Sequence, residues 1–507
     1  MTRSILLTVI GVGVWLAWLT FPYQIDDASI FYRYAQNIAE GFGPTFNRGR
    51  PPVEGFTSPA WTLVLALASR VFGADHLPMA ARVLGTLAYV GCMLLIVRLT
   101  KHSTGGLLAA ALWGFSPGAT FYATTGLDEL LFVIVILSFH GTVGGAFGTR
   151  PGVTAGALAM WVRPEGPWLL PAASAQLLAQ RELWTRVRSL ALRLGAAVVV
   201  GGLVLLAMRW SIFHSLLPNT FYAKEPSAHS GWRYLTGAWG EPRAAAILTC
   251  GLLGSLVGGP VFRGYGAAAA AWIAAGVLEG GDWMPAGRLF QPGFALFAVA
   301  SAGIVVRAAT SQKRWVPVLA TTALAAVLPL EISGAIWRAN QAQERVTLRG
   351  YEYTAISDWF RASTAHSIAL VDIGELAFAS PNAEVIDLAG LTDARVARTP
   401  GRHMHKTFDV DYLFDDRRPD IILLRVAEMP KRDAEGHFDV GDTRMSQAES
   451  DIVDDPRLAR DYRQVFLQVP KVLTKPLYGR LIYARREFVL PKEATPASDT
   501  ITFDPPR

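Results

Sequence analysis

The sequence predicts a helical membrane protein of about eleven transmembrane helices with a soluble α/β domain at its C-terminal end. Of its 507 residues, 51% are hydrophobic and 17% are charged, and the mean hydropathy is +0.29. The charge is uneven: residues 1–338 contain 24 Lys and Arg and 14 Asp and Glu, whereas residues 339–507 contain 23 and 27. These values exclude a disordered chain. They predict a lipid-embedded domain over 1–338 and a water-soluble one over 339–507.

Apolar segments approaching the ~20 residues that cross ~30 Å of hydrocarbon recur along the first domain. We interpret the first of them, which follows Arg3, as a retained membrane helix rather than a signal peptide, because no A-x-A-like cleavage site follows it and many apolar segments do. The predicted spans are 5–18, 79–97, 105–121, 130–147, 152–164, 166–180, 190–210, 244–262, 265–279, 289–306 and 315–333.

Two segments need separate interpretation. Residues 58–72 are apolar enough for a short span, but counting them as one would put Arg98 and Lys101 on the outer side, so we expect an interfacial or re-entrant helix. Residues 152–180 would form only about 43 Å of helix at 1.5 Å per residue. We therefore expect two short helices that meet at a break over 163–166, which is tolerated where the backbone lines a protein cavity.

The orientation follows from the positive charges. With the N-terminus in the cytoplasm, the cytoplasmic turns collect Arg and Lys, as the positive-inside rule requires, and the C-terminal domain lies outside the membrane. The net charge of +6 therefore belongs to membrane turns and does not indicate nucleic-acid binding. Inside the C-terminal domain, short β-branched runs predict strands at 368–371, 385–388 and 421–424.

Adjacent carboxylates, Asp26 and Asp27, directly follow the first span and begin a pattern typical of a helix lying along the membrane surface. One interpretation is structural: the pair ends one helix and caps the next. The other is catalytic: one carboxylate acts as a general base and its neighbour positions an acceptor hydroxyl or a cation. The residues themselves leave both interpretations open.

Further polar residues stand beside Gly and Pro next to apolar segments, and the predicted topology puts them all on the outer side. Ionisable groups near a membrane boundary are costly unless they are paired or solvated, so they are candidates for a functional site. With the Asp pair they predict the wall of one cavity. The candidate substrate-binding residues are Arg33, Tyr34, Glu54, Asp128, Glu129, Arg163, Glu165, Asn219, Tyr222, Lys224, Asp282 and Arg288.

The motifs that contain these residues carry a resemblance. The run from DDASIFYRYAQN through VEGFTSP, followed by TTGLDELLF, RPEG, LPNTFYAK and GGDWMPAGR, resembles the GT-C class of polyprenyl-phosphate-dependent glycosyltransferases. Within that class it is most similar to the terminal β-(1→2) arabinofuranosyltransferases of actinobacteria. It departs from them in two places, at Gly-Leu-Asp128-Glu129 and at Gly49-Arg50-Pro51-Pro52.

The resemblance implies an enzyme of the bacterial inner membrane that uses a polyprenyl-phospho-sugar donor, arabinofuranose by resemblance, and a cell-envelope glycan acceptor on the outer face. The donor phosphate would be held by Arg163, Lys224 or Arg288, and Asp26 or Asp27 would deprotonate the acceptor hydroxyl, giving inversion. A divalent cation, Mg²⁺ or Mn²⁺, is left open because Asp26, Asp27, Asp128 and Glu129 carry suitable oxygen ligands. No metal site is assigned.

Two alternatives remain. Broken helices and charged groups in the membrane are also typical of a lipid or solute transporter, although here the acids gather on one side and no repeat is evident. The second alternative is a non-catalytic envelope scaffold. That protein would tolerate replacement of both Asp26 and Asp27.

Overall fold

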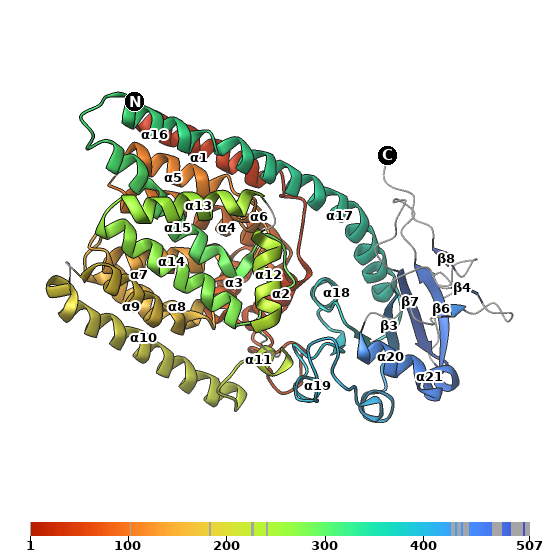
Figure 1. The fold of residues 1–507 in the computed structure, drawn as a ribbon. Helices are drawn as coiled ribbons and strands as arrows, with labels where there is room; N and C mark the ends of the chain where they lie inside the picture. Colours follow the sequence, from red (N-terminus) through yellow and green to blue (C-terminus); the bar gives the residue numbers. More distant parts are fainter. Residues whose placement is uncertain are drawn as a thin grey trace.

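The computed structural model describes residues 2–101, 103–181, 184–224, 228–239, 242–426, 431–432, 438–439, 446–468, 479–487 and 500–501. Two parts are evident in Figure 1: a bundle of long helices and, beyond the end of one of them, a smaller part built around a β-sheet. The N-terminus lies at the end of the bundle remote from the sheet.

Helices make up the first part throughout. The predicted break at 163–166 is present: α8 ends at Val162 and the backbone of Arg163 is extended, as expected for a residue that precedes proline. The helices are α1 (Thr2–Trp18), α2 (Asp26–Ala39), α3 (Pro59–Phe72), η1 (Ala74–His76), α4 (Leu77–Leu99), α5 (Thr104–Gly114), α6 (Pro117–Tyr122), α7 (Glu129–Val143), α8 (Thr149–Val162), η2 (Gly166–Trp168), α9 (Leu169–Ala179), α10 (Trp184–Phe213), α11 (Asn219–Ala223), α12 (Ala228–Trp239), α13 (Pro242–Val257), α14 (Pro260–Leu278), η4 (Arg288–Phe290), α15 (Gln291–Ala308), α16 (Trp315–Ala325) and α17 (Leu328–Ala362).

Every predicted span coincides with one of these helices or with a consecutive pair. Within the described residues, five helical stretches are long and apolar enough to cross a membrane, and five shorter apolar helices accompany them, α3 included. Large apolar side chains on α10 and α16, such as Leu192, Leu203 and Val318, are more than half exposed. Lipid covers such surfaces in a membrane protein, so the predicted class of multi-pass helical membrane protein is confirmed.

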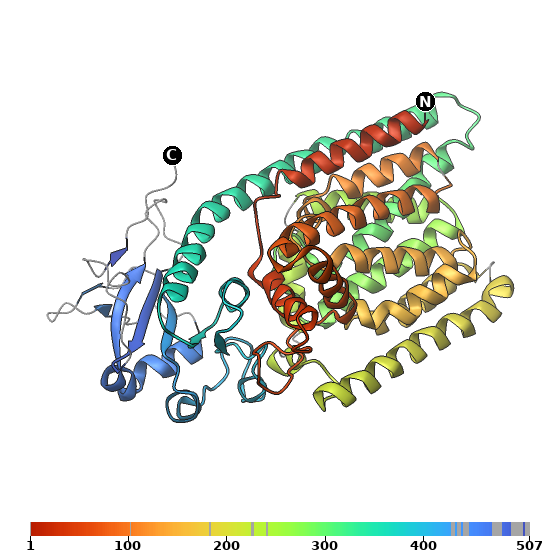
Figure 2. The same ribbon diagram turned by 180° about the vertical axis from the view of Figure 1, so that it is seen from behind.

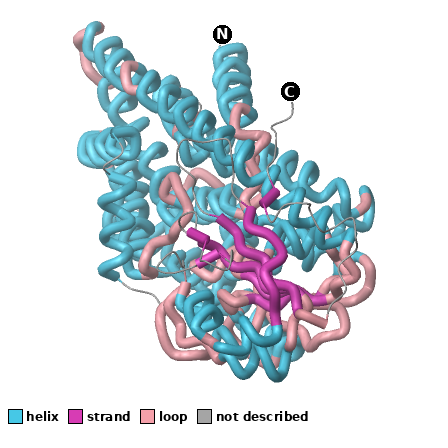
Figure 3. Tube along the Cα trace, turned by 90° about the vertical axis from the view of Figure 1, so that its right-hand side faces the viewer, coloured by secondary structure: helices cyan, strands magenta, loops and turns pink. Residues whose placement is uncertain are grey.

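The C-terminal part contains a six-stranded mixed sheet of order β2-β1-β3-β7-β6-β8 (Figure 3). Strands β1, β2 and β3 are parallel and coincide with the three predicted strands, which are thereby confirmed. Strand β7 pairs with β3 and β6 in the antiparallel sense. The elements are β1 (Ser367–Leu370), α18 (Gly374–Ala379), β2 (Glu384–Asp387), α19 (Ala394–Ala397), η5 (Tyr412–Arg417), β3 (Ile421–Val426), β4 (Lys431–Arg432), β5 (Phe438–Asp439), α20 (Gln447–Asp454), α21 (Pro456–Asp461), β6 (Tyr462–Gln468), β7 (Gly479–Arg485) and β8 (Thr500–Ile501).

Helix α17 joins the two parts. It packs beside α1 in the bundle and continues without a break to the sheet (Figure 2), so the predicted boundary between residues 338 and 339 falls inside a helix. The loops that leave the carboxyl ends of β1 and β2 face the bundle, where α18 packs on α2 and α19 packs on α11. Ligands of parallel sheets commonly bind at this edge, which here faces the predicted site.

Candidate functional site

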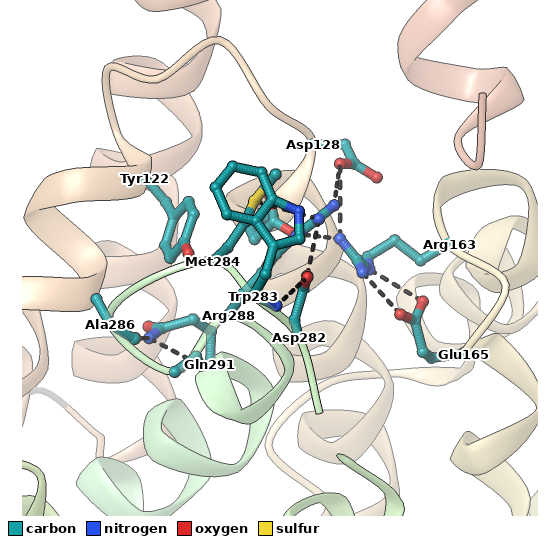
Figure 4. A network of polar contacts seen from close by, with 12 residues as sticks. Tyr122, Asp128, Arg163, Glu165, Asp282, Trp283, Met284, Ala286, Arg288 and Gln291 are labelled. Carbon is teal, nitrogen blue, oxygen red and sulfur yellow. Dashed lines mark hydrogen bonds and ion pairs between the residues drawn. The ribbon is translucent and has the colours of Figure 1, made fainter. Parts of the chain in front are cut away.

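Four acids and two arginines form a buried charge cluster where α7, the break after α8 and the 280–288 loop meet (Figure 4). Arg163 donates to Glu129 and, through two nitrogens at 3.0 and 2.7 Å, to Glu165. Arg288 donates to Glu129 and, at 3.0 Å, to Asp282. The fourth acid, Asp128, completes the cluster: it is fully buried 3.6 Å from Arg163 and 4.0 Å from Arg288.

Six of the predicted residues therefore meet in one place, as the sequence indicates, but the arginines do not stand ready for a phosphate. Carboxylates already bind both guanidinium groups, and the cluster carries four acids against two bases. Its chemical role in this structure is to fix the break after α8 and the 280–288 loop relative to α7.

The 280–288 loop keeps its shape through glycine and hydrogen bonds. Gly281 has φ +75°, and a Cβ there would lie 2.5 Å from that of Tyr234, so no other residue fits without strain. The carbonyl of Pro285 accepts from Tyr122 at 2.5 Å, and that of Ala286 accepts from Gln291 at 2.8 Å. This explains the glycine directly before Asp282.

The two aspartates of α2 have different surroundings. Asp26 turns to the C-terminal part, where its carboxylate accepts the backbone N–H groups of Gly374 at 2.9 Å and Glu375 at 2.8 Å. The N-cap of α2 is Ile25, without a side-chain hydrogen bond, so Asp26 binds the start of α18 instead of capping its own helix. Burial raises the pKa of Asp26 to about 7, and the negative charge of Asp372 contributes to the increase.

Asp27 makes no hydrogen bond or ion pair with the residues that the structure describes, and its side chain is half-buried. Neighbouring helix residues point about 100° apart, which is why one aspartate docks on α18 and the other faces away from that contact. Burial raises the pKa of Asp27, while the positive charges of Lys224 and Arg288 act in the opposite direction. Its carboxylate is therefore free to accept a proton.

Lys224 differs from the two arginines. It follows α11, is half-buried, and has no hydrogen bond or ion pair with a described residue. It lies near enough to Asp27 and Asp282 for the charges to interact. Three cations are predicted to hold a phosphate. The guanidinium groups of Arg163 and Arg288 are bound by carboxylates, whereas the ammonium group of Lys224 is available.

The other predicted residues hold loops and connect the two parts. Arg33 is fully buried and donates to the carbonyls of Phe46, Ala377, Ser380 and Ala383 at 2.6–2.9 Å, so it binds the end of α18. With Asp26 at the start of that helix, α2 holds α18 at both ends. We call this arrangement the α18 clamp.

Four other predicted residues hold loops near the contact between the two parts: Tyr34, Glu54, Asn219 and Tyr222. The hydroxyl of Tyr34 donates to Val53 at 2.5 Å and accepts from Gly55 at 3.0 Å. Glu54 pairs with Arg209 of α10 at 2.8 Å, both buried. The side chain of Asn219 donates to Gly390 and Leu391 and accepts from Arg398, whose guanidinium also covers the ring of Tyr222 at 4.4 Å.

Loss of the α18 clamp should loosen the C-terminal part. Replacing Arg33 with methionine removes a charged donor that binds four carbonyls. We expect amide hydrogen exchange in residues 374–383 to accelerate by about tenfold or more, while exchange in α14 and α15 stays unchanged. Arg98→Met serves as the control, because this arginine is exposed in the last turn of α4 and contacts Phe147. Equal exchange in the two variants would contradict the clamp.

Several residues of the site are not among those predicted from the sequence. A cavity of about 380 Å³ lies beside the 280–288 loop, between α6, α12, α13 and α17. Apolar side chains such as Ile247 and Phe294 form its walls together with charged groups. A search for ionisable residues inside apolar segments would have found two of the missed residues, Arg209 in segment 190–210 and Glu331 in segment 315–333. Those missed are Arg209, Arg233, Glu331, Arg338, Asp372, Arg398 and His403.

The four acids considered for a divalent cation do not share one place. Asp26 binds α18, whereas Asp128 and Glu129 face arginines. Among the described residues, no group of three His, Cys, Asp or Glu side chains is placed to hold a metal ion.

Comparison with known proteins gives a partial family match and a fold match. Residues 335–485 match a family described as "Domain of unknown function (DUF8728)". A comparison of the sequence with curated proteins finds no match. ArnT from Cupriavidus metallidurans bound to undecaprenyl phosphate has a similar structure, with a TM-score of 0.56 at 13% identity, over 98% of this chain and 99% of that chain.

The archaeal oligosaccharyltransferase AglB from Archaeoglobus fulgidus, in complex with an inhibitory peptide and a dolichol-phosphate, has a TM-score of 0.56 at 10% identity. The match covers 92% of this chain and 80% of that one. Because the ArnT match spans both parts nearly from end to end, it concerns the whole arrangement and not the helices alone. The chain therefore has the GT-C-like fold that the sequence predicts: a helical membrane domain followed by a soluble α/β domain.

Proposed function

We propose that this protein is a membrane glycosyltransferase that uses a polyprenyl-phospho-sugar donor. The sugar, arabinofuranose by the sequence resemblance, goes to a cell-envelope glycan on the outer face of the inner membrane, with inversion. The observation that carries the proposal is the free carboxylate of Asp27 beside the free ammonium of Lys224, at the junction of the membrane bundle and the C-terminal part. The shared fold with proteins solved with undecaprenyl phosphate and dolichol-phosphate supports the class of donor.

The proposed reaction is a single displacement. Asp27 accepts the proton of the acceptor hydroxyl, and the hydroxyl oxygen forms a bond to the anomeric carbon of the donor sugar. The bond from that carbon to the phosphate oxygen breaks, and the phosphate leaves on its polyprenyl chain with one more negative charge. Lys224 stabilises that charge, because a fixed cation in a partly dry site acts most strongly where charge develops. Arg163 and Arg288 position the loops through their carboxylate partners.

The two domains divide these tasks in our proposal. Residues 1–338 bind the lipid-linked donor, and the 380 Å³ cavity next to Asp282 offers apolar walls for a polyprenyl chain. Residues 339–507 stand on the extracytoplasmic side, with the N-terminus in the cytoplasm, and position the acceptor glycan. The α18 clamp holds them against the catalytic helix.

The test is sugar transfer by the purified protein in detergent. Radiolabelled polyprenyl-phospho-arabinose and an oligo-arabinofuranoside are incubated with the protein, and parallel reactions use the mannose and aminosugar donors. We expect transfer from one donor and an inverted linkage in the product, read by NMR. A reaction after chelator treatment, with and without added Mg²⁺ or Mn²⁺, determines whether a divalent cation is needed.

Absence of transfer from every donor would contradict the proposal. The same preparation then tests the rival activity in sealed liposomes, where a transporter would move lipid or solute across the bilayer without making a new glycosidic bond.

A further inference from the structure

His403 lies in a loop of the C-terminal part that folds onto the membrane domain. Hydrogen bonds within residues 399–407 keep the loop compact: Lys406 donates to the carbonyl of Thr399 at 2.8 Å, and the backbone N–H of Thr407 donates to Pro400 at 2.9 Å. Gly401 has φ +116°, and a Cβ there would lie 2.6 Å from the carbonyl oxygen of His405. The loop is thus built around a fixed turn, which holds the imidazole in one place.

The ring of His403 faces charged groups from other segments. It lies beside the end of α11, where the backbone of Ala223 bonds with the ring, and near enough to Lys224 and to Asp282 for their charges to interact; Lys406 of its own loop is also near. Its Nδ1 atom is buried and has no hydrogen-bond partner among the described residues. Buried polar atoms in native proteins are nearly always satisfied, so an unpaired ring nitrogen at this position calls for a ligand.

The charge of the ring depends on what stands next to it. Burial lowers the pKa of His403 to about 4, and the positive charge of Lys224 contributes to the decrease. An anion placed between the two groups would reverse the effect of Lys224 and favour the imidazolium form. The same position adjoins Asp27 through Lys224, as the proposed reaction requires of the donor phosphate.

We propose that His403 is a further donor-binding residue, which joins Lys224 in holding the phosphodiester of the lipid-linked sugar. This inference rests on the proposed function and extends it. The C-terminal part then does more than hold the acceptor: it contributes a ligand to the donor phosphate. The hydrogen bonds of Asn219 with Gly390, Leu391 and Arg398 hold the chain that precedes this loop beside α11.

The experiment measures binding of farnesyl methyl phosphate, a phosphodiester without a sugar, to the full-length protein in detergent between about pH 7.5 and 5.5. The probe keeps one negative charge over this range, so a change in affinity reflects protonation of groups in the protein. For wild type we expect affinity to increase about tenfold toward the lower pH, because the bound anion raises the pKa of His403 and binding takes up a proton.

Two variants of His403 and one control determine which group causes the pH dependence of binding. In His403→Gln we expect weak binding without the pH dependence, and in His403→Lys we expect tight binding at every pH because the added cation is permanent. His405→Gln, which changes an exposed histidine two residues along the same loop, should behave as wild type. Asp26 and Asp27 also titrate with raised pKa values, so pH-dependent binding that persists in His403→Gln would assign the effect to them and overturn the inference.

Failure of this inference and failure of the proposed function give different results. Binding does not require turnover, so pH-independent binding of farnesyl methyl phosphate by a protein that transfers sugar rejects only the role of His403. If wild type and His403→Lys bind as expected but no donor is turned over, the phosphodiester site stands and the transferase assignment falls. Wild type alone gives the first measurement, so a variant that fails to fold does not leave the inference untested.

Discussion

Asp27→Asn is expected to lower the turnover of sugar transfer by about 10²–10⁴-fold, the usual contribution of a general base. The amide has nearly the shape of the carboxylate but cannot accept the proton of the acceptor hydroxyl. Because Asp27 makes no hydrogen bond or ion pair with a described residue, no contact is broken and the melting temperature should stay within a few degrees of wild type. The measurement is kcat with the accepted donor, together with thermal unfolding in the same detergent.

Asp26→Asn is the matched control, because it makes the same chemical change one residue away. Here the amide can still accept one of the two N–H groups of Gly374 and Glu375 but presents a donor to the other. We expect faster hydrogen exchange at the start of α18, a lower melting temperature and a loss of turnover of only about tenfold, which follows from the loosened clamp. If turnover were intact in Asp27→Asn and abolished in Asp26→Asn, Asp26 and not Asp27 would be the general base.

The pH dependence of transfer is a second test of Asp27 as the general base. A base must be ionised, so turnover should fall as the pH decreases through the pKa of Asp27, which burial raises above its usual range. Activity is thus expected to be lost at a higher pH than for an exposed aspartate. Asp26→Asn should keep this acidic limb, since the limb belongs to Asp27.

Arg288→Met should produce a large loss of stability. The substitution removes the ion-pair partner of Asp282 and one of the two guanidinium groups that bind Glu129. Removing one partner of a buried ion pair costs about 3–5 kcal/mol, because the remaining charge has lost both water and its counter-ion. We expect a decrease of that size in the free energy of unfolding, measured by denaturant unfolding in mild detergent.

Arg395→Met is the control for this substitution. Arg395 also binds two carboxylates, those of Asp409 and Asp416, but all three side chains are exposed, so the unfolding midpoint should not change measurably. A double variant, Arg288→Met with Asp282→Asn, should recover part of the loss, because it removes the carboxylate whose ion pair the first change broke, whereas Glu129 keeps Arg163. Equal stability of Arg288→Met and Arg395→Met would show that the cluster does not depend on buried charge.

Much of the fold could be predicted because each prediction depends on short stretches of sequence. Apolar segments longer than about 15 residues give helices in a membrane whatever they pack against, so the breaks at Arg163 and the start of α4 follow from local composition. The three β-branched runs became β1, β2 and β3 for the same reason. The gathering of Glu129, Arg163 and Arg288 was also predictable, because the positive-inside rule puts their loops on one side of the membrane.

The roles of individual residues could not be predicted in this way. The sequence presents Asp26 and Asp27 as equals, yet Asp26 binds backbone groups 348 residues away while Asp27 stays free. Arg163 and Arg288 have the charge to bind a phosphate, and only their carboxylate partners in the folded chain prevent it.

By itself, then, the sequence determined the membrane helices and the strands, and it predicts the side of the membrane on which the polar motifs meet, since hydropathy and charge act residue by residue. Only the tertiary structure decided which aspartate is free, which cation is available and that His403 reaches the site. Those properties depend on which groups far apart in the chain satisfy one another's charges and hydrogen bonds, and local sequence does not record that pairing.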